Sequence, residues 1–187
     1  MKVSKGEHGY ISKRKKAQLI KTILYFVISA SIFIIGLALN DWDKSNIFTI
    51  IAVLGVLPAS KMMISFIILA PYHSVEDAMY ERLIVNAKQE DVVYNDIVLT
   101  SQQKVMNLAI LVIAGNKAIG LIGKKNENRT YIETYLNKGF ESHGFALKAK
   151  IYEDEASFVH QLKVVERNEM EDESRTEWKK FLESLMV

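Results

Sequence analysis

Basic side chains gather near one predicted strand end and the helix that follows it. They are Lys117, Lys124, Lys125 and Arg129. Helix N–H groups and basic side chains converge at such a place in α/β sheets, which favours an anionic ligand. The spacing therefore predicts a site for a small nucleotide or phosphorylated metabolite. In two alternatives, the same basic face docks on anionic lipid headgroups or pairs with the acidic C-terminal helices of its own domain.

Signatures of other chemistries are missing from the sequence. The chain has no cysteine, which excludes a thiol nucleophile, a disulfide scaffold and cysteine-ligated metal. It has no dinucleotide or phosphate-binding glycine loop, no H-E-x-x-H and no G-x-S-x-G. His143 and His160 would form a metal site only if folding brought them to Glu141, and we assign no partner to His8 or His73. We expect no metal ion and no cofactor, and we favour a non-catalytic protein.

Two apolar stretches precede the region that carries these residues. Thr22–Leu39 is free of charge for 18 residues, and Ile47–Ala70 is interrupted only by Lys61. About 20 helical residues cross a hydrocarbon core of about 30 Å. The pattern predicts transmembrane helices over 19–39 and 47–70, joined by an external loop at 40–46. Pro58 predicts a kink in the second helix.

Basic residues set the expected orientation in the membrane. The cluster before the first span consists of Lys13, Arg14, Lys15 and Lys16. We expect the two spans to lie in the inner (plasma) membrane. The positive-inside rule then places the basic segment 1–18 and the region 71–187 in the cytoplasm. The cluster also attracts anionic lipid. Lys61 is expected to reach the interface with its flexible stem, the alternative being a ligand contact at membrane depth.

Small residues lie along one face of the second span. Ala52, Gly55 and Ala59 allow close approach of another helix backbone. That helix is either the first span of the same chain, around Ser29 and Gly36, or a second copy in a homo-oligomer. The sequence leaves both alternatives open.

The region after Pro71 alternates between helical and strand patterns. We expect a helix over 75–88, strands at 92–100, 107–114 and 117–123, a helix opened by Thr130, an edge strand at 146–152, a helix capped by Asp154 and a last helix. Gly115-Asn116 predicts a hairpin turn between the second and third strands. The expected architecture is a membrane α-helical hairpin (two transmembrane helices) plus a small cytoplasmic α/β domain of order αβββαβαα.

This order resembles the core of the restriction-endonuclease-like superfamily, which includes nuclease-related domains of small bacterial two-span membrane proteins. The resemblance covers residues 75–152. It implies an acid near the start of the second strand and an acid-x-lysine motif on the third. The acids would hold magnesium, and the lysine would support the nucleophile. This sequence has Asn107 and Ile122-Gly123-Lys124 at those positions. Glu76, Glu81 and Asp96 are the remaining carboxylates. The resemblance thus implies a degenerate, inactive core.

The charge is divided unevenly along the chain. Residues 1–70 hold nine Lys/Arg and three Asp/Glu, whereas residues 71–187 hold fifteen and nineteen. An acidic domain argues against sequence-specific nucleic-acid binding. We therefore expect a membrane-anchored sensor or scaffold whose cytoplasmic domain binds a small anionic ligand or a protein partner. A membrane-tethered nuclease-like enzyme and a pore-forming effector are the alternatives.

Overall fold

The computed structural model describes residues 4–125, 127–167 and 172–187. Its elements are α1 (Tyr10–Leu39), α2 (Ile47–Leu69), α3 (Asp77–Ile84), β1 (Val92–Thr100), β2 (Val105–Ala114), β3 (Lys117–Ile122), α4 (Arg129–Ser142), β4 (Lys148–Tyr152), α5 (Glu155–Val164) and α6 (Asp172–Leu185). The chain divides into two compact units. We call residues 12–71 the hairpin unit, and residues 72–187 with the described residues up to Ile11 the α/β domain. The expectation of two long apolar helices followed by a small mixed α/β domain is confirmed.

The hairpin unit consists of two helices that are long and apolar enough to cross a membrane, judged by length and composition. α1 begins at Tyr10, nine residues before the predicted span, so the basic cluster lies within the helix. α2 begins as predicted, and the Asn46 side chain caps it by accepting from the Thr49 N–H at 3.0 Å. The helix continues through Pro58.

The interior of the hairpin unit is built from small and polar residues. Ala52 and Ala59 on α2 are buried, as is Ser29 on α1. A methyl group added at Gly55 would lie 2.5 Å from Ser29 Oγ, so the two backbones approach closely there. The predicted small-residue face thus packs within the chain, as the first alternative proposed.

The sheet of the α/β domain has the order β1-β2-β3-β4. The first three strands form an antiparallel meander, and β4 pairs parallel to β3. The β2–β3 turn is the predicted Gly115-Asn116, with Gly115 at a φ of +55° that favours glycine. A parallel pair needs a long crossover connection, which α4 supplies.

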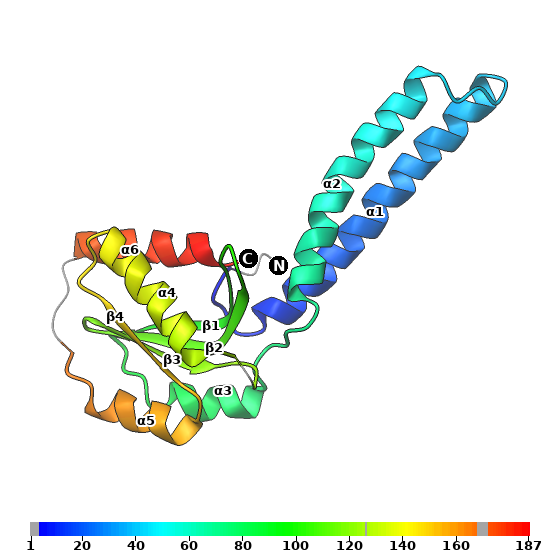
Figure 1. Cartoon of the computed structure of the whole chain (residues 1–187). Helices are drawn as coiled ribbons and strands as arrows, with labels where there is room; N and C mark the ends of the chain where they lie inside the picture. The colour runs from blue at the N-terminus through cyan, green and yellow to red at the C-terminus, as the bar shows by residue number, and fades with distance from the viewer. Residues whose placement is uncertain (1–3, 126, 168–171) are drawn as a thin grey trace. The chain divides into compact units, whose positions relative to one another are not determined.

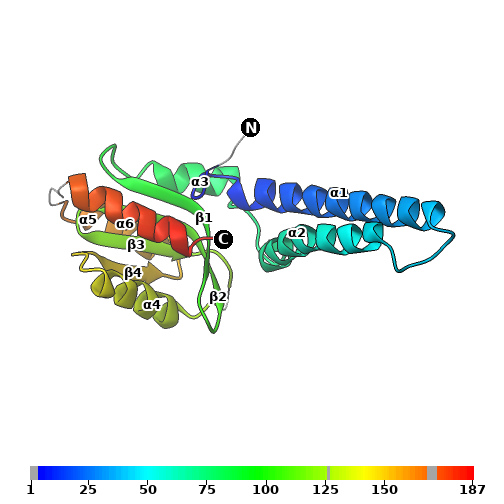
Figure 2. The ribbon, with the colours of Figure 1, turned by 90° about the horizontal axis from the view of Figure 1, so that it is seen from above.

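Helices cover both faces of this sheet (Figure 1). α4 and α6 pack on one face through residues that include Leu136, Phe140 and Trp178. α3 and α5 pack on the other face through Leu83, Phe158 and Leu162. Seen from above, α4 and α6 lie in front of the strands (Figure 2). The apolar run of β2 is buried on both sides because it is an inner strand between two helical layers.

Residues 4–11 belong to the α/β domain. The Asn95 N–H of β1 donates to Gly6 O at 2.7 Å, so the N-terminal segment covers the outer edge of that strand. His8 Nε2 lies 2.7 Å from Asp77 Oδ1, and its ring stacks on Tyr80 at 4.2 Å between centroids. His8 therefore has two partners, Asp77 and Tyr80, that sequence reasoning missed.

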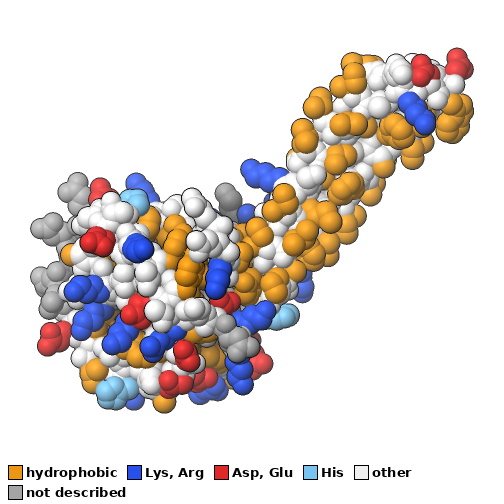
Figure 3. Space-filling view, viewed as in Figure 1, with side chains coloured by type: hydrophobic (Ala, Val, Ile, Leu, Met, Phe, Trp, Pro, Cys, Tyr) orange, Lys and Arg blue, Asp and Glu red, His pale blue; other side chains and the backbone are white. Residues whose placement is uncertain are grey.

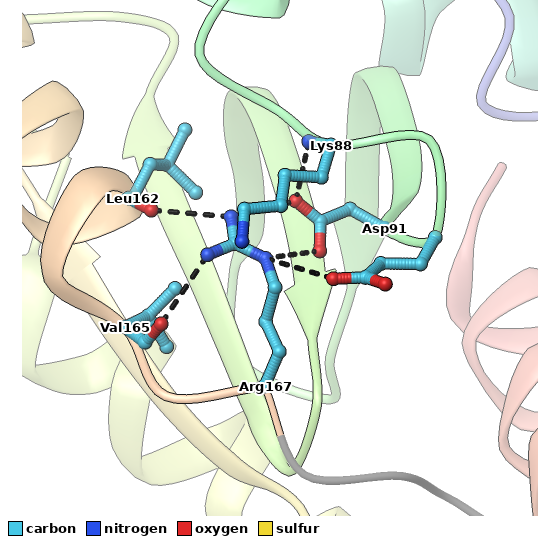
Figure 4. A network of polar contacts seen from close by, with 6 residues as sticks. Lys88, Asp91, Leu162, Val165 and Arg167 are labelled. Carbon is cyan, nitrogen blue, oxygen red and sulfur yellow. Dashed lines mark hydrogen bonds and ion pairs between the residues drawn. The ribbon is translucent and has the colours of Figure 1, made fainter.

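A buried ion pair joins the segment after α5 to the turn between α3 and β1 (Figure 4). Arg167 donates two hydrogen bonds of 2.9 Å to the Asp91 carboxylate, and Asp91 also accepts from the Lys88 N–H at 2.8 Å. The guanidinium further donates to the Leu162 and Val165 carbonyls at 3.2 Å. The hydrogen bonds to Asp91 raise the pKa of Arg167. The pair fixes the α3–β1 turn to the end of α5.

Helix starts show which capping predictions hold. The Asp154 side chain accepts from the Ser157 N–H at 2.8 Å, as predicted, and this bond lowers the pKa of Asp154. α4 begins at Arg129 because Asn128, not Thr130, is its N-cap. α3 is shorter than the predicted 75–88: it starts after Glu76 and ends at Ile84.

Candidate functional site

The structure separates the four predicted anion-binding residues into two groups. Lys124 and Lys125 follow the last residue of β3, and Arg129 is the first residue of α4. Lys117 is the first residue of β3. A six-residue strand spans about 17 Å at about 3.3 Å per residue, so Lys117 lies at the opposite end. The prediction of one four-residue cluster is wrong for Lys117.

The group at the carboxyl end of β3 gains a fourth cation. Lys104, in the turn between β1 and β2, lies over the Tyr131 ring at 5.4 Å from its centroid. Lys124 lies over the Tyr72 ring at 5.7 Å. We call Lys104, Lys124, Lys125 and Arg129 the basic rim. Sequence reasoning missed Lys104 because β-strand pairing, not sequence proximity, brings the β1–β2 turn to the end of β3.

Glu127 and the N-cap residue Asn128 make the basic rim less suited to binding a small anion. Burial raises the pKa of Glu127, while Lys124, Lys104 and a hydrogen bond from the Asn107 backbone lower it. Glu127 therefore offsets part of the rim's positive charge. The Asn128 side chain already accepts from the Tyr131 N–H at 2.9 Å, so one donor of the α4 N-terminus is occupied.

The other group forms where β3 and β4 begin. Lys117 pairs directly with Lys148, and Lys150 pairs with Ile119 two residues along. Directly paired residues of neighbouring strands present their side chains on the same face. We call Lys117, Lys148 and Lys150 the lysine trio. Within the described part of the chain, no side chain of the trio makes a hydrogen bond or ion pair.

A hollow of about 870 Å³ runs along this edge of the sheet. The lysine trio lines it together with Gln161 of α5, the segment 145–147, and Glu133, Asn137 and Glu141 of α4. The trio thus opens on a concave surface large enough for a small molecule.

Side chains from α4 close the outer backbone edge of β4 inside the hollow. Asn137 Nδ2 donates to Ala149 O at 3.1 Å, and Asn137 Oδ1 accepts from the Ala149 N–H at 2.8 Å. Glu133 Oε2 accepts from the Ile151 N–H at 3.1 Å. A strand edge covered in this way is protected against pairing with another chain.

The positions implied by the nuclease resemblance lie next to each other but carry no acid. The Gly123 N–H donates to Asn107 O at 3.1 Å, so the β2 and β3 positions are neighbours. The buried Asn107 amide donates to Ile97 O at 3.0 Å, which is a structural role. Asp96 is buried on β1 and accepts from the Val75 N–H at 2.9 Å. The described residues hold no group of three His, Cys, Asp or Glu side chains suited to a metal ion.

The histidine positions are likewise apart. His143 caps α4, and its ring packs beside Phe145 and Phe181 at 5.7 and 4.3 Å between centroids. His160 is exposed on α5, which covers the opposite face of the sheet. Glu141 is exposed near the end of α4. The structure does not bring these three residues together.

The basic residues of the hairpin unit have mixed surroundings. Lys15 Nζ donates to Ala70 O at 3.0 Å and so satisfies a carbonyl at the end of α2. Lys13, Lys16 and Lys61 are exposed, whereas Arg14 is half-buried. Sequence reasoning assigned Lys15 to lipid and missed this capping contact.

We compared the chain with known protein families, curated proteins and solved structures. No protein-family model, curated protein or solved structure matches this chain.

Proposed function

We propose that this protein is a membrane-anchored, non-catalytic sensor or scaffold. α1 and α2 cross the inner (plasma) membrane, the loop 40–46 lies outside, and the α/β domain lies in the cytoplasm. The domain offers a binding surface for an anionic partner. The distribution of exposed hydrophobic residues carries this proposal.

Exposed hydrophobic surface is concentrated in the hairpin unit. Among the described residues, all large hydrophobic side chains that are exposed, apart from Val85 and Val164, lie between Leu19 and Ile67 (Figure 3). Soluble proteins rarely expose a continuous apolar patch of this extent, and transfer of such surface into hydrocarbon is favourable. The cluster Lys13–Lys16 against the acidic loop supports the orientation.

The basic rim supports contact between the domain and lipid headgroups. Only two residues, Ala70 and Pro71, separate Leu69, the last residue of α2, from Tyr72, which limits the distance between the Leu69 and Tyr72 Cα atoms to about 10 Å. Lys124 lies over the Tyr72 ring. A short link therefore joins the domain to the end of a span, and each rim lysine that reaches an anionic leaflet would contribute about 1 kcal/mol.

Topology is tested by labelling single cysteines, since the chain has none of its own. Ser45→Cys in the loop and Thr134→Cys on α4 are both exposed positions. An impermeant maleimide should label Ser45→Cys in intact cells and Thr134→Cys only after permeabilisation. Labelling of Thr134→Cys in intact cells would reverse the orientation, and a protein that remains soluble without detergent would remove the membrane proposal.

The headgroup contact is tested with a dye on Gln102→Cys, beside Lys104. Its emission should shift when full-length protein moves from phosphatidylcholine nanodiscs to nanodiscs containing phosphatidylglycerol. Salt and the double variant Lys104→Ala/Lys124→Ala should remove the shift, while Lys163→Ala on α5 should not. An unchanged emission would instead favour a protein partner, to be sought by crosslinking in cells.

The two alternatives have their own discriminating results. Magnesium-dependent cleavage of DNA or RNA, abolished by Lys124→Ala, would establish the nuclease-like alternative. Ion flux through liposomes that contain the protein would establish the pore-forming alternative.

A further inference from the structure

We propose that the lysine trio and its hollow form a binding site for a small phosphorylated molecule that carries at least two negative charges. This site is distinct from the basic rim, since the two lie at opposite ends of β3. The trio comes from two paired strands, and the hollow supplies the volume for a ligand of small-molecule size.

The spacing of the trio fits a polyanion. Neighbouring strands lie about 4.8 Å apart, and residues two apart along a strand are about 6.6 Å apart. Three ammonium groups on flexible stems can therefore reach different oxygens of one diphosphate group. Like charges directly opposite each other on paired strands repel. Lys117 and Lys148 are such a pair, and a bound anion would offset their repulsion.

The groups facing the trio from other elements do not neutralise it. Glu133 and Glu141 of α4 also line the hollow, which leaves a net charge of 3 − 2 = +1. The Glu133 carboxylate is engaged by the Ile151 N–H. From α5, the residue in the hollow is the neutral Gln161, which hydrogen-bonds the Tyr152 hydroxyl at 3.1 Å. Both acids therefore oppose ligand binding, and Glu141 is the one whose side chain does not also hold the edge of β4.

The closed edge of β4 favours a small molecule over an extended peptide. A peptide that added a fifth strand would need the outward N–H and C=O groups of Ala149. The Asn137 amide occupies both of them. Strand pairing at Ala149 is therefore blocked, and the cationic side chains that line the hollow are the three lysines.

The test is calorimetric titration of inorganic pyrophosphate into the full-length protein in nanodiscs of phosphatidylcholine. This lipid carries no net charge, so headgroups do not compete. We expect saturable 1:1 binding that falls at least about tenfold in Lys148→Ala and in Lys150→Ala, because each removes a charge-assisted hydrogen bond. Lys138→Ala and Lys163→Ala, exposed lysines outside the hollow, should bind as the unmodified protein does.

A gain-of-affinity variant guards against loss through misfolding. Glu141→Gln removes one opposing charge at an exposed position and should tighten binding severalfold. Far-UV circular dichroism confirms the fold of each variant. Absence of saturable binding, or equal binding by Lys148→Ala and Lys150→Ala, would overturn the proposal. Pyrophosphate binding that is lost only in Lys124→Ala would place the site at the basic rim and overturn the proposal. The membrane anchor and the headgroup contact are tested separately, by the cysteine-labelling and dye experiments.

Discussion

The hairpin unit and the α/β domain have opposite arrangements of side-chain size and polarity. In the hairpin unit the buried positions other than Leu69 are small or polar, such as Ser29, Ala52 and Ala59, while most large aliphatic residues face outward. In the α/β domain the fully buried positions include Trp178 and Phe158, and the described charged residues other than Asp96 and the Asp91–Arg167 pair are at least partly exposed. This inversion is the pattern expected if, as proposed, the hairpin unit lies in lipid and the α/β domain in water. Water drives large apolar groups inward, whereas lipid does not, so close backbone approach determines helix packing there.

This comparison predicts its largest effect in the core of the domain. Phe158→Ala should destabilise the α/β domain by about 3–5 kcal/mol, since Phe158 of α5 is fully buried against the sheet. Ile50→Ala in the hairpin unit removes an outward side chain and should change domain unfolding by less than about 0.5 kcal/mol. Urea unfolding in nanodiscs, followed by Trp178 fluorescence in a Trp42→Phe background, measures both. Similar losses for the two variants would contradict the proposed difference in solvent.

The next effect concerns the ion pair that joins α5 to the α3–β1 turn. Asp91→Asn should cost about 3 kcal/mol, because it leaves the buried Arg167 guanidinium without its charged partner. Arg167→Met should cost a similar amount. In a double-mutant cycle measured by the same unfolding assay, the double variant should lose much less than the sum of the two single losses. Additive losses would mean that the two residues act independently.

The sequence predicted most elements of the domain because their signals are local. The two-sided apolar run of β2, the Gly115-Asn116 turn and the Asp154 cap each depend on a few neighbouring residues. The alternation of Lys148 and Lys150 with buried Ala149 and Ile151 likewise predicted an edge strand. Such signals act within one element and need no knowledge of the tertiary fold.

The candidate sites were harder to predict because they depend on strand pairing. The parallel β3–β4 register places Lys117 beside Lys148, which is 31 residues away in sequence. The β1–β2 turn brings Lys104 to the basic rim by the same means. The docking of Gly6 on β1 is also a long-range contact without a sequence motif. An alternation of lysines on an edge strand was the signal available for the trio, but it indicated exposure and not a partner.

The hairpin unit should respond to the opposite kind of substitution, from small to large. Gly55→Leu should separate α1 from α2 at a cost of about 1–3 kcal/mol, because even one added carbon would lie 2.5 Å from Ser29 Oγ. Val53→Leu, on the outward face, should be neutral. Steric-trap unfolding in bicelles measures the hairpin, and the Trp178 signal should show no change in the domain. Increased self-association of Gly55→Leu without hairpin loss would instead favour an intermolecular role for this face.

The smallest effect is expected at the basic rim, where burial and charge act against each other. Burial raises the pKa of Glu127 above 4.5, and Lys124 and Lys104 oppose that shift. The folded state therefore holds the Glu127 proton more tightly than the unfolded state, so stability from this group is present at low pH and is lost as pH rises above about 4.5. Glu127→Gln should remove the loss, making the variant more stable than the unmodified protein at neutral pH and similar to it at pH 4.

Lys124→Gln should act in the opposite direction on the same titration. Removing the attraction from Lys124 leaves burial less opposed, which raises the pKa of Glu127 further and deepens the loss at neutral pH. The double variant Glu127→Gln/Lys124→Gln should regain the shallow pH dependence of Glu127→Gln, since the titrating acid is gone. Urea unfolding between pH 4 and 7 measures all three. If Lys124→Gln left the pH dependence of the unmodified protein unchanged, Lys124 would not be close enough to act on Glu127, and the basic rim would consist of separate surface charges.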